Sequence, residues 1–222
     1  MNPEPGGDRE TGADPQSTYD RIAAHFSKTR EYAWPEVESF LDGRAATRAL
    51  DLGCGNGRHA ELLAERADAV VGVDLSRALL REAVSRARDR GFDANVSFVH
   101  GDAASLPLAT DSVGLAVYVA TLHHLPARED RIRSLDEIAR VLAPGGTALV
   151  SAWSTAHDRF DREEGFDTTV DWTLPGGETV PRYYHIYSPA EFEADLAGSD
   201  LEPVEVDVSS GNCYATVTAS GD

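Results

Sequence analysis

The stretch that decides the fold of this 222-residue chain is DLGCGNG, at residues 51–57. Glycines at alternate positions let the backbone turn sharply and approach a ligand that a Cβ atom would exclude. An apolar run precedes the glycines, and the helix expected after them directs free N–H groups at the same ligand. The stretch therefore predicts a nucleotide-like cofactor at the carboxyl edge of a parallel sheet, in contact with Gly53, Cys54, Gly55, Asn56 and Gly57.

Two cofactors are compatible with this loop. Residues 55–60, GNGRHA, match the dinucleotide fingerprint G-x-G-x-x-A of dehydrogenases. Asp51 stands two residues before Gly53, and a buried carboxylate there suits a cationic or hydroxyl-rich ligand better than a pyrophosphate. The pattern Asp-x-Gly-x-Gly-x-Gly resembles the first motif of class I S-adenosylmethionine (SAM) methyltransferases. In that family the acidic residue helps to place the methionine end of the cofactor, and the glycines pass under the ribose.

The ends of the next two expected strands carry further carboxylates. Asp74 follows the apolar run 69–73, where a carboxylate can accept two hydrogen bonds from a ribose diol, in NAD enzymes as in methyltransferases. The third strand ends in Gly-Asp-Ala at 101–103, which resembles the methyltransferase element whose aspartate binds the adenine amino group. Three aspartates in this order favour SAM over NAD. The expected cofactor contacts beyond the loop are Asp51, Asp74, Leu75, Asp102 and Ala103.

Strand and helix signals alternate along the rest of the chain. Strands are expected at 47–52, 69–74, 95–100, 113–120, 147–153, 201–208 and 212–219, and helices at 58–66, 76–90 and 127–142. This order predicts an α/β fold: a doubly wound, Rossmann-like sheet that is mostly parallel, with an antiparallel last strand. Residues 16–222 are expected to form one domain, in which the polar, aromatic stretch 154–187 is a substrate-side insertion without clear periodicity. Residues 1–15 are rich in Pro, Gly and acids and are predicted to be a disordered acidic tail.

The charge of the chain is strongly unbalanced, with a net charge of −18 and Lys28 as the only lysine. An ordinary acidic protein is one explanation. Adaptation to the salt-rich cytoplasm of a halophile is favoured, because dense carboxylates stay hydrated and salt screens their mutual repulsion. Concentrated salt also removes most of the repulsion that would otherwise argue against a nucleic-acid substrate.

Other features of the sequence narrow its location and chemistry. No apolar run reaches the roughly 18 residues of a membrane span, and the start of the chain has no signal-peptide pattern. A cytoplasmic protein without membrane contact is therefore expected. No metal site is predicted, because the two cysteines form no zinc framework and the adjacent side chains of His123 and His124 diverge.

Motifs outside the cofactor core resemble those of the tRNA wobble-uridine carboxyl methyltransferases. They are YDRIAAHFSKTR at 19–30, LHHL at 122–125, Trp153 at the end of the fifth strand, and RYYH at 182–185. The resemblance implies SAM-dependent methyl transfer to the carboxylate of 5-carboxymethyluridine at the anticodon wobble position of tRNA, which gives a methyl ester. It also implies a complex with a small zinc-binding activator protein.

The resemblance implies roles for five residues at the acceptor site. Arg30 and Arg182 are expected to bind a carboxylate or phosphate through their planar guanidinium groups. Trp153 and Tyr183 are expected to stack on an extruded base. His124 is expected to position the acceptor or to hydrogen-bond with it, because an ionised carboxylate needs no general base.

The insertion departs from the pattern of this family. Relatives usually carry a Gln-containing segment where residues 154–157 are Ser-Thr-Ala-His, and a Pro-Trp pair where this chain has Asp171-Trp172. Cys213 stands where an aromatic residue is common, and Trp34 and Tyr184 are expected to be packing residues. Two alternatives stay open: a SAM-dependent methyltransferase that acts on a small molecule, a protein or another RNA, and a catalytically silent methyltransferase-like binding module.

The third strand suggests where a partner would bind. It is usually the edge of the sheet in this fold, and here it carries the apolar residues Val96, Phe98 and Val99. An exposed apolar edge strand promotes aggregation unless something pairs with it or covers it. A small zinc-ribbon activator that adds a strand near Val96–Val99 would do so.

Overall fold

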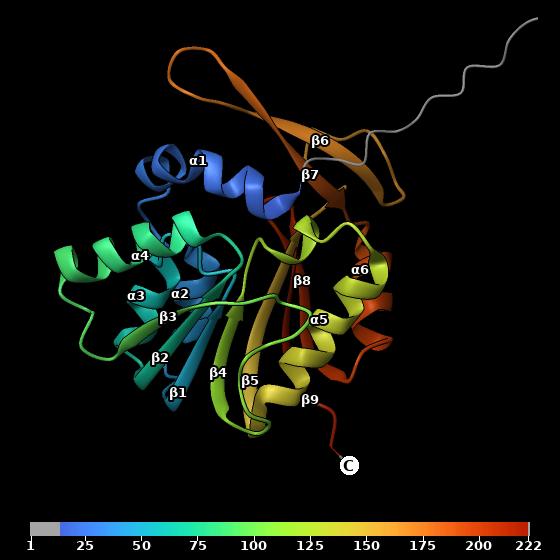
Figure 1. Ribbon diagram of the computed structural model, residues 1–222. Coiled ribbons are helices and arrows are strands. Elements are labelled where there is room, and N and C mark those ends of the chain that lie inside the picture. Colours follow the sequence, from blue (N-terminus) through green and yellow to red (C-terminus); the bar gives the residue numbers. More distant parts are fainter. Residues whose placement is uncertain (1–13, 222) are drawn as a thin grey trace, which may run out of the picture.

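The computed structural model describes residues 14–221 and has a seven-stranded sheet at its centre (Figure 1). The strand order is β3-β2-β1-β4-β5-β9-β8. The bounds are β1 Ala46–Leu52, β2 Ala67–Asp74, β3 Val96–His100, β4 Val113–Tyr118, β5 Leu142–Trp153, β8 Leu201–Ser209 and β9 Asn212–Ala219. Strands β1 to β5 pair in parallel, whereas β9 pairs antiparallel with both β5 and β8. The predicted α/β, doubly wound fold is confirmed. Its strand order reverses between β1 and β4, and ligands bind at such switch points in open α/β sheets.

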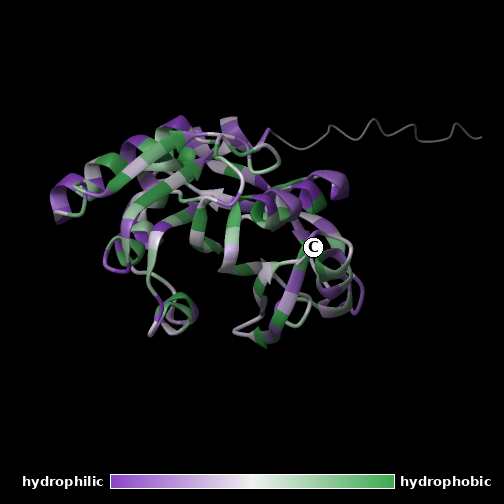
Figure 2. Ribbon diagram, turned by 90° about the horizontal axis from the view of Figure 1, so that it is seen from below, coloured by the Kyte–Doolittle hydropathy of each residue, from purple (hydrophilic) through white to green (hydrophobic). Residues whose placement is uncertain are grey.

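Helices cover both faces of this sheet. They are α1 Pro15–Thr29, α2 Pro35–Leu41, α3 Arg58–Ala64, α4 Arg77–Arg90, α5 Arg128–Val141 and α6 Pro189–Ala197, with a short 3₁₀ helix, η1, at Leu122–His124. Successive residues of a strand point to opposite faces, so Ala49 packs with α2 and α3 while Leu50 packs with α5 and α6. Figure 2 shows the hydrophobic strands lying between helices of mixed character. Among residues 14–221, no helix has the length and apolar character needed to cross a membrane.

The stretch 154–187 contains a β-hairpin that was not predicted. Strand β6 Phe166–Thr173 pairs antiparallel with β7 Thr179–Ile186, apart from the main sheet. On β7 the side chains of Val180, Arg182 and Tyr184 alternate on one face and are buried. A buried arginine in this row hides the apolar–polar alternation that indicates a strand. The prediction that this insertion lacks a regular pattern is therefore wrong for residues 166–186, which form the hairpin.

Helix α1 forms a roof over the carboxyl edge of the sheet, between α4 and the hairpin (Figure 1). Asp20 accepts a hydrogen bond of 2.7 Å from Ser76 Oγ, just before α4. Further along α1, Ile22 is fully buried against Trp172 of the hairpin. One helix therefore joins the region around β2 to the insertion.

The start of α1 bears on the predicted tail. Asp14 caps the helix by accepting a hydrogen bond of 3.0 Å from Ser17 N–H, and Pro15 occupies the first turn, where its missing N–H has no cost. These two residues belong to the folded domain. The rest of the predicted tail, residues 1–13, lies outside the described residues.

Candidate active site

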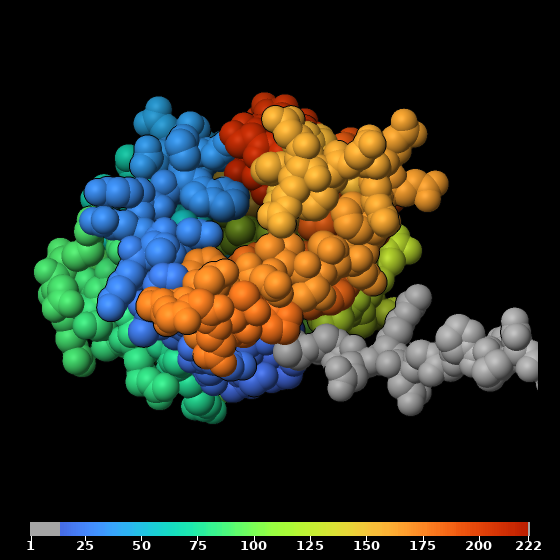
Figure 3. Space-filling view, turned by 90° about the horizontal axis from the view of Figure 1, so that it is seen from above, coloured from blue at the N-terminus to red at the C-terminus, as the bar shows by residue number. Residues whose placement is uncertain are grey.

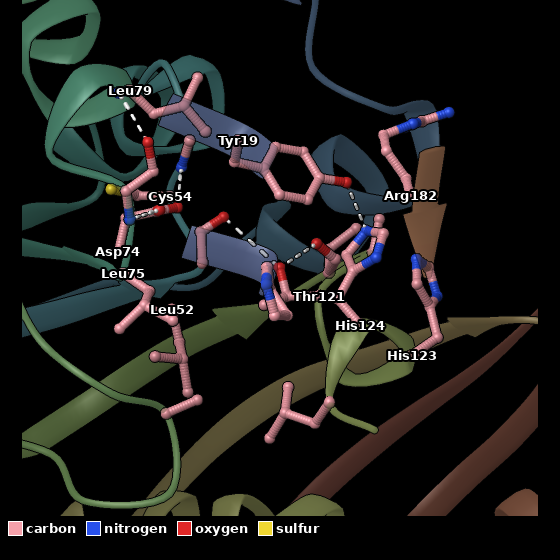
Figure 4. Close-up of a pocket in the computed structure, with 18 of the residues that line it drawn as sticks. Tyr19, Leu52, Cys54, Asp74, Leu75, Leu79, Thr121, His123, His124 and Arg182 are labelled. Carbon is pink, nitrogen blue, oxygen red and sulfur yellow. Dashed lines mark hydrogen bonds between the residues drawn. The ribbon is translucent and has the colours of Figure 1, made fainter. Parts of the chain in front are cut away.

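A cavity of about 750 Å³ opens at the carboxyl ends of β1, β2 and β4, beneath α1 and the hairpin. Figure 3 shows it as a hollow between the blue atoms before β1 and the yellow-orange atoms near residue 160, with olive atoms near residue 120 at its floor. Figure 4 shows Asp74 on one side of the cavity and His124 and Arg182 on the other, with Tyr19 between them. We refer to these as the β2 side and the hairpin side.

The glycine loop after β1 forms the floor of the β2 side. Gly53, Gly55 and Gly57 have φ angles of 69°, 53° and 78°, in the left-handed region that glycine adopts without strain. A Cβ atom on Gly53 would lie 2.1 Å from Thr121 Oγ1, so packing also requires glycine there. Gly57 faces the sheet, since a Cβ on it would lie 3.1 Å from Phe98. The loop residues that line the cavity are Gly53, Cys54, Gly55 and Asn56.

Two carboxylates stand at the strand ends on the β2 side. Asp74 accepts hydrogen bonds of 2.8 Å from Gly55 N–H and from Ser76 N–H, one on each oxygen. These bonds fix its orientation and leave a lone pair on each oxygen. Asp102 accepts a bond of 2.9 Å from Ala104 N–H through one oxygen. The predicted contacts Asp74, Leu75, Asp102 and Ala103 all line the cavity.

Asp51 lies behind the loop, and it is absent from the residues that line the cavity. Its side chain is 1% exposed, and burial raises its pKa to about 7. Within the described residues its Oδ2 atom has no hydrogen-bond partner. A buried carboxylate with an unused acceptor atom favours a nearby positive charge, which fits the predicted role toward the cationic end of a cofactor.

His124 is fixed as a neutral acceptor on the hairpin side. Its Nδ1 lies 3.0 Å from the carbonyl oxygen of Tyr183, so Nδ1 carries the proton and donates. Its Nε2 therefore accepts the 2.8 Å bond from the hydroxyl of Tyr19. Burial lowers the pKa of His124 to about 4. A histidine held in this state is a weak base, and the geometry supports a positioning role.

Arg182 is a buried cation on the same side. It is 8% exposed, and its guanidinium carbon lies 4.8 Å from the ring centroid of Trp172 and 5.1 Å from that of Tyr184. The structure gives Arg182 no ion pair with any acidic side chain of residues 14–221, and its Nε has no hydrogen-bond partner there. Buried charges are normally paired. An anion bound in the cavity would supply the partner that Arg182 lacks.

Of the other three residues predicted for the hairpin side, two line the cavity and one does not. Arg30 lines the cavity, with its guanidinium carbon 5.3 Å from the Trp172 ring, and Trp153 lines it with its ring 5.3 Å from that of Tyr184. Tyr183 does not line the cavity: its hydroxyl donates a 2.7 Å bond to Asp167. Neighbours on a strand face opposite ways, so this placement corrects the prediction that Tyr183 stacks on the acceptor.

Several known proteins that resemble this chain are methyltransferases. A family model described as "Methyltransferase domain" matches residues 49–146. The mouse tRNA (carboxymethyluridine(34)-5-O)-methyltransferase ALKBH8 is 35% identical over 137 residues, which are 61% of this chain and 19% of that protein. A putative methyltransferase of Encephalitozoon cuniculi is 34% identical over 177 residues, covering 76% of this chain and 78% of that protein. The chain belongs to the class I SAM-dependent methyltransferases. It spans about a fifth of the length of the mouse relative.

The fold of this methyltransferase recurs in solved structures. The CcbJ methyltransferase from Streptomyces caelestis has a TM-score of 0.76 at 22% identity, covering 94% of this chain and 100% of that one. The complex between the Haloferax volcanii Trm112 methyltransferase activator and the putative methyltransferase contains a chain with a TM-score of 0.69 at 17% identity, covering 94% and 99%. At these identities the likeness concerns the fold.

SAM is the cofactor of this methyltransferase, and the β2 side fits it. Gly53 and Gly55 supply the positive φ angles that the turn beneath the cavity requires, and Asp74 would present two fixed oxygens to a ribose diol. Asp102 would use its remaining oxygen for the adenine amino group. The unpartnered oxygen of Asp51 would face the positive end of the cofactor from behind the loop.

Three aromatic side chains of the site were not predicted as contacts. Tyr19 holds His124 from α1, Trp172 lies under both Arg30 and Arg182, and Tyr184 lines the cavity between His124 and Trp153. Tyr19 and Tyr184 stand inside the quoted motifs 19–30 and 182–185, which is the one signal in the sequence that singles them out.

Proposed function

We propose that this methyltransferase transfers a methyl group to a carboxylate, and that the acceptor is 5-carboxymethyluridine at the wobble position of tRNA. The observation that carries the proposal is Arg182, a buried guanidinium in the cavity without an acidic partner among the described residues. This is notable in a chain with 38 acidic and 20 basic side chains, where partners abound. The name of the mouse relative supports the choice of acceptor.

The residues of the hairpin side suit a carboxylate acceptor. Bound SAM supplies a methyl group on a positively charged sulfur, and its transfer to a carboxylate oxygen moves no proton. Arg182 would bind one oxygen of the acceptor and leave the other free to react. His124 is neutral and both of its ring nitrogens are already hydrogen-bonded, so it would orient the acceptor by contact and not as a proton donor or base. The rings of Trp153 and Tyr184 would exclude water, which strengthens the attraction between the opposite charges that meet there.

Nucleoside analysis tests the choice of acceptor. Total tRNA from a strain that lacks this protein is expected to accumulate 5-carboxymethyluridine and to lose its methyl ester. Complementation with the wild-type chain is expected to restore the ester, whereas the Arg182→Gln variant is not. Unchanged wobble nucleosides in the deletion strain would favour a small molecule, a protein or another RNA as acceptor.

The proposal includes a small activator subunit, a zinc-ribbon protein that docks on β3. Within residues 14–221, strand β3 is the end of the sheet and pairs only with β2. Its residues Val96, Phe98 and Val99 are partly buried, and Phe98 packs toward Gly57 and Gly72. Docking would therefore use the open backbone groups of the edge, by strand addition. The Haloferax complex, which pairs a methyltransferase with the Trm112 activator, supports the proposal.

Hydrogen–deuterium exchange tests this docking. On adding the activator, the backbone amides of β3 are expected to exchange more slowly. The opposite edge, β8, provides the internal control: it carries the exposed residues Val204, Val206 and Val208 and is expected to keep its exchange rates. Protection of β8 instead of β3 would contradict the proposed docking site.

The charge of the chain supports a further part of the proposal, a salt-rich cytoplasm as the working environment. Carboxylates that repel one another at low ionic strength are screened when salt is concentrated. Thermal stability and methyl transfer are therefore expected to rise with KCl into the molar range. A protein that is most stable and most active at low salt would contradict this.

A further inference from the structure

Residues 157–166 form part of the rim of the cavity on the hairpin side. His157 and Arg159 line the cavity, and Figure 3 shows the yellow-orange atoms of this segment beside the hollow. Hydrogen bonds within the segment give it a defined shape: Phe160 N–H donates to the carbonyl of His157 at 2.9 Å, and Arg159 N–H donates to His157 Nδ1 at 3.0 Å.

Two arginines of this rim stack on aromatic rings instead of pairing with acids. The guanidinium carbon of Arg159 lies 5.8 Å from the ring centroid of Trp153, and that of Arg162 lies 4.3 Å from the ring centroid of Phe166. Four acidic residues stand in the same segment, at positions 158, 161, 163 and 164. Even so, the described residues contain no ion pair of either arginine. Both cations are thus held in place and free to bind an anion.

A row of rings connects these arginines with the interior of the cavity. Tyr184, which lies under Arg182, is 5.3 Å from Trp153 between ring centroids. Trp153 is 4.8 Å from Phe160, and Phe160 is 5.5 Å from Phe166. Three guanidinium groups therefore follow one another along this row, from the buried Arg182 through Arg159 to the exposed Arg162.

We propose that Arg159 and Arg162 bind phosphate groups of the nucleotides next to the acceptor, so that the enzyme holds a single-stranded RNA segment and not an isolated nucleoside. This inference rests on the proposed function, which places a modified uridine beside Arg182. Guanidinium groups are suited to phosphate because their planar fork donates two parallel hydrogen bonds. The four acidic side chains of the segment outnumber its two arginines, so the rim does not attract anions in general. Binding would therefore require a phosphate placed directly at the stacked guanidinium groups.

The test compares two acceptors that differ in flanking phosphates. They are an anticodon stem-loop RNA carrying 5-carboxymethyluridine and the free nucleoside 5-carboxymethyluridine. The variant is Arg162→Glu, and Arg162→Gln removes the charge without adding one. The matched control is Arg48→Glu, an equal change of charge on an exposed residue of β1, at the amino end of the strand and away from the cavity. SAM affinity and melting temperature verify that each variant is folded.

The expected result is a loss of preference for the stem-loop. The ratio of kcat/KM for stem-loop over nucleoside is expected to fall at least tenfold in Arg162→Glu, and to stay within twofold of wild type in Arg48→Glu. The salt dependence of kcat/KM for the stem-loop should become less steep by about 0.7 in log–log slope, the value for one lost contact to single-stranded nucleic acid. An unchanged ratio and slope, with the stem-loop still methylated, would overturn this inference alone. A wild-type enzyme that methylates neither acceptor would overturn the proposed function, and this inference with it.

Discussion

Replacing Arg182 by glutamine removes the one feature on which the proposed acceptor depends. Hydrogen bonds to a charged group contribute about 1.5–3 kcal/mol, which corresponds to roughly 10- to 150-fold in kcat/KM at 1.4 kcal/mol per factor of ten. The loss is expected for the acceptor alone, because Arg182 lies on the hairpin side and the residues that fit SAM lie on the β2 side. The melting temperature should change little, because removing a buried cation without an ion-pair partner favours folding, whereas losing its contacts with the Trp172 and Tyr184 rings opposes it.

The assay combines methyl transfer to a 5-carboxymethyluridine stem-loop with calorimetric titration of SAM, both in concentrated KCl. The matched control is Tyr183→Phe, since this neighbour on β7 points away from the cavity and loses only its hydroxyl bonds to Asp167 and to the carbonyl of Pro126. It is expected to keep kcat/KM within twofold of wild type. Wild-type transfer by Arg182→Gln, or an equal loss in Tyr183→Phe, would refute the assignment of Arg182 to the acceptor.

Three further predictions concern the loop and the roof. Gly53→Ala is expected to reduce SAM affinity and melting temperature, because its Cβ would lie 2.1 Å from Thr121 Oγ1 and its φ is positive; calorimetry and thermal melting check this, and unchanged values would contradict it. Burial raises the pKa of Asp51 to about 7. Between about pH 4 and 7 the folded state therefore keeps a proton that the unfolded state releases, so the free energy of unfolding is expected to fall as the pH rises through this range. Asp51→Asn should therefore melt above wild type at pH 8 but not at pH 3.5, and bind SAM more weakly; equal melting of the two proteins at every pH would contradict the shift. Tyr19→Phe removes the donor to His124 Nε2 and is expected to reduce kcat by about 2- to 12-fold, from the 0.5–1.5 kcal/mol of one hydrogen bond, with no effect on SAM affinity; a kcat equal to wild type would show that the bond is dispensable.

The cofactor half of the site follows from local sequence. Strand–loop–helix units place their loops at one edge of a parallel sheet, so a glycine turn and an aspartate at each strand end suffice to predict neighbours in space. The structure adds one distinction: Asp51 and Gly57 belong to the loop but lie behind its surface. The path of the backbone through the turn determines which loop residues face the cavity, and the identity of a single residue does not reveal this.

The acceptor half was predicted less well, because it depends on contacts between distant segments. The bond between Tyr19 and His124 joins residues 105 positions apart, and the Trp172 ring under Arg30 comes from an unpredicted strand. Without that strand, nothing in the sequence shows that Arg182 and Tyr184 share one face while Tyr183 occupies the other. The resemblance predicted that these residues lie near the acceptor, but the alternation on β7 determines which of them line the cavity.

The most direct test of the account is whether methyl transfer requires the carboxylate of the acceptor. Two stem-loop RNAs are compared, one with 5-carboxymethyluridine and one with the uncharged amide, 5-carbamoylmethyluridine, at the same position. With isotopically labelled SAM, mass spectrometry is expected to find an alkali-labile methyl ester on the first RNA and no methyl group on the second. Equal transfer to both RNAs, or transfer to a base or ribose atom, would contradict the claim that Arg182 holds a carboxylate for methylation.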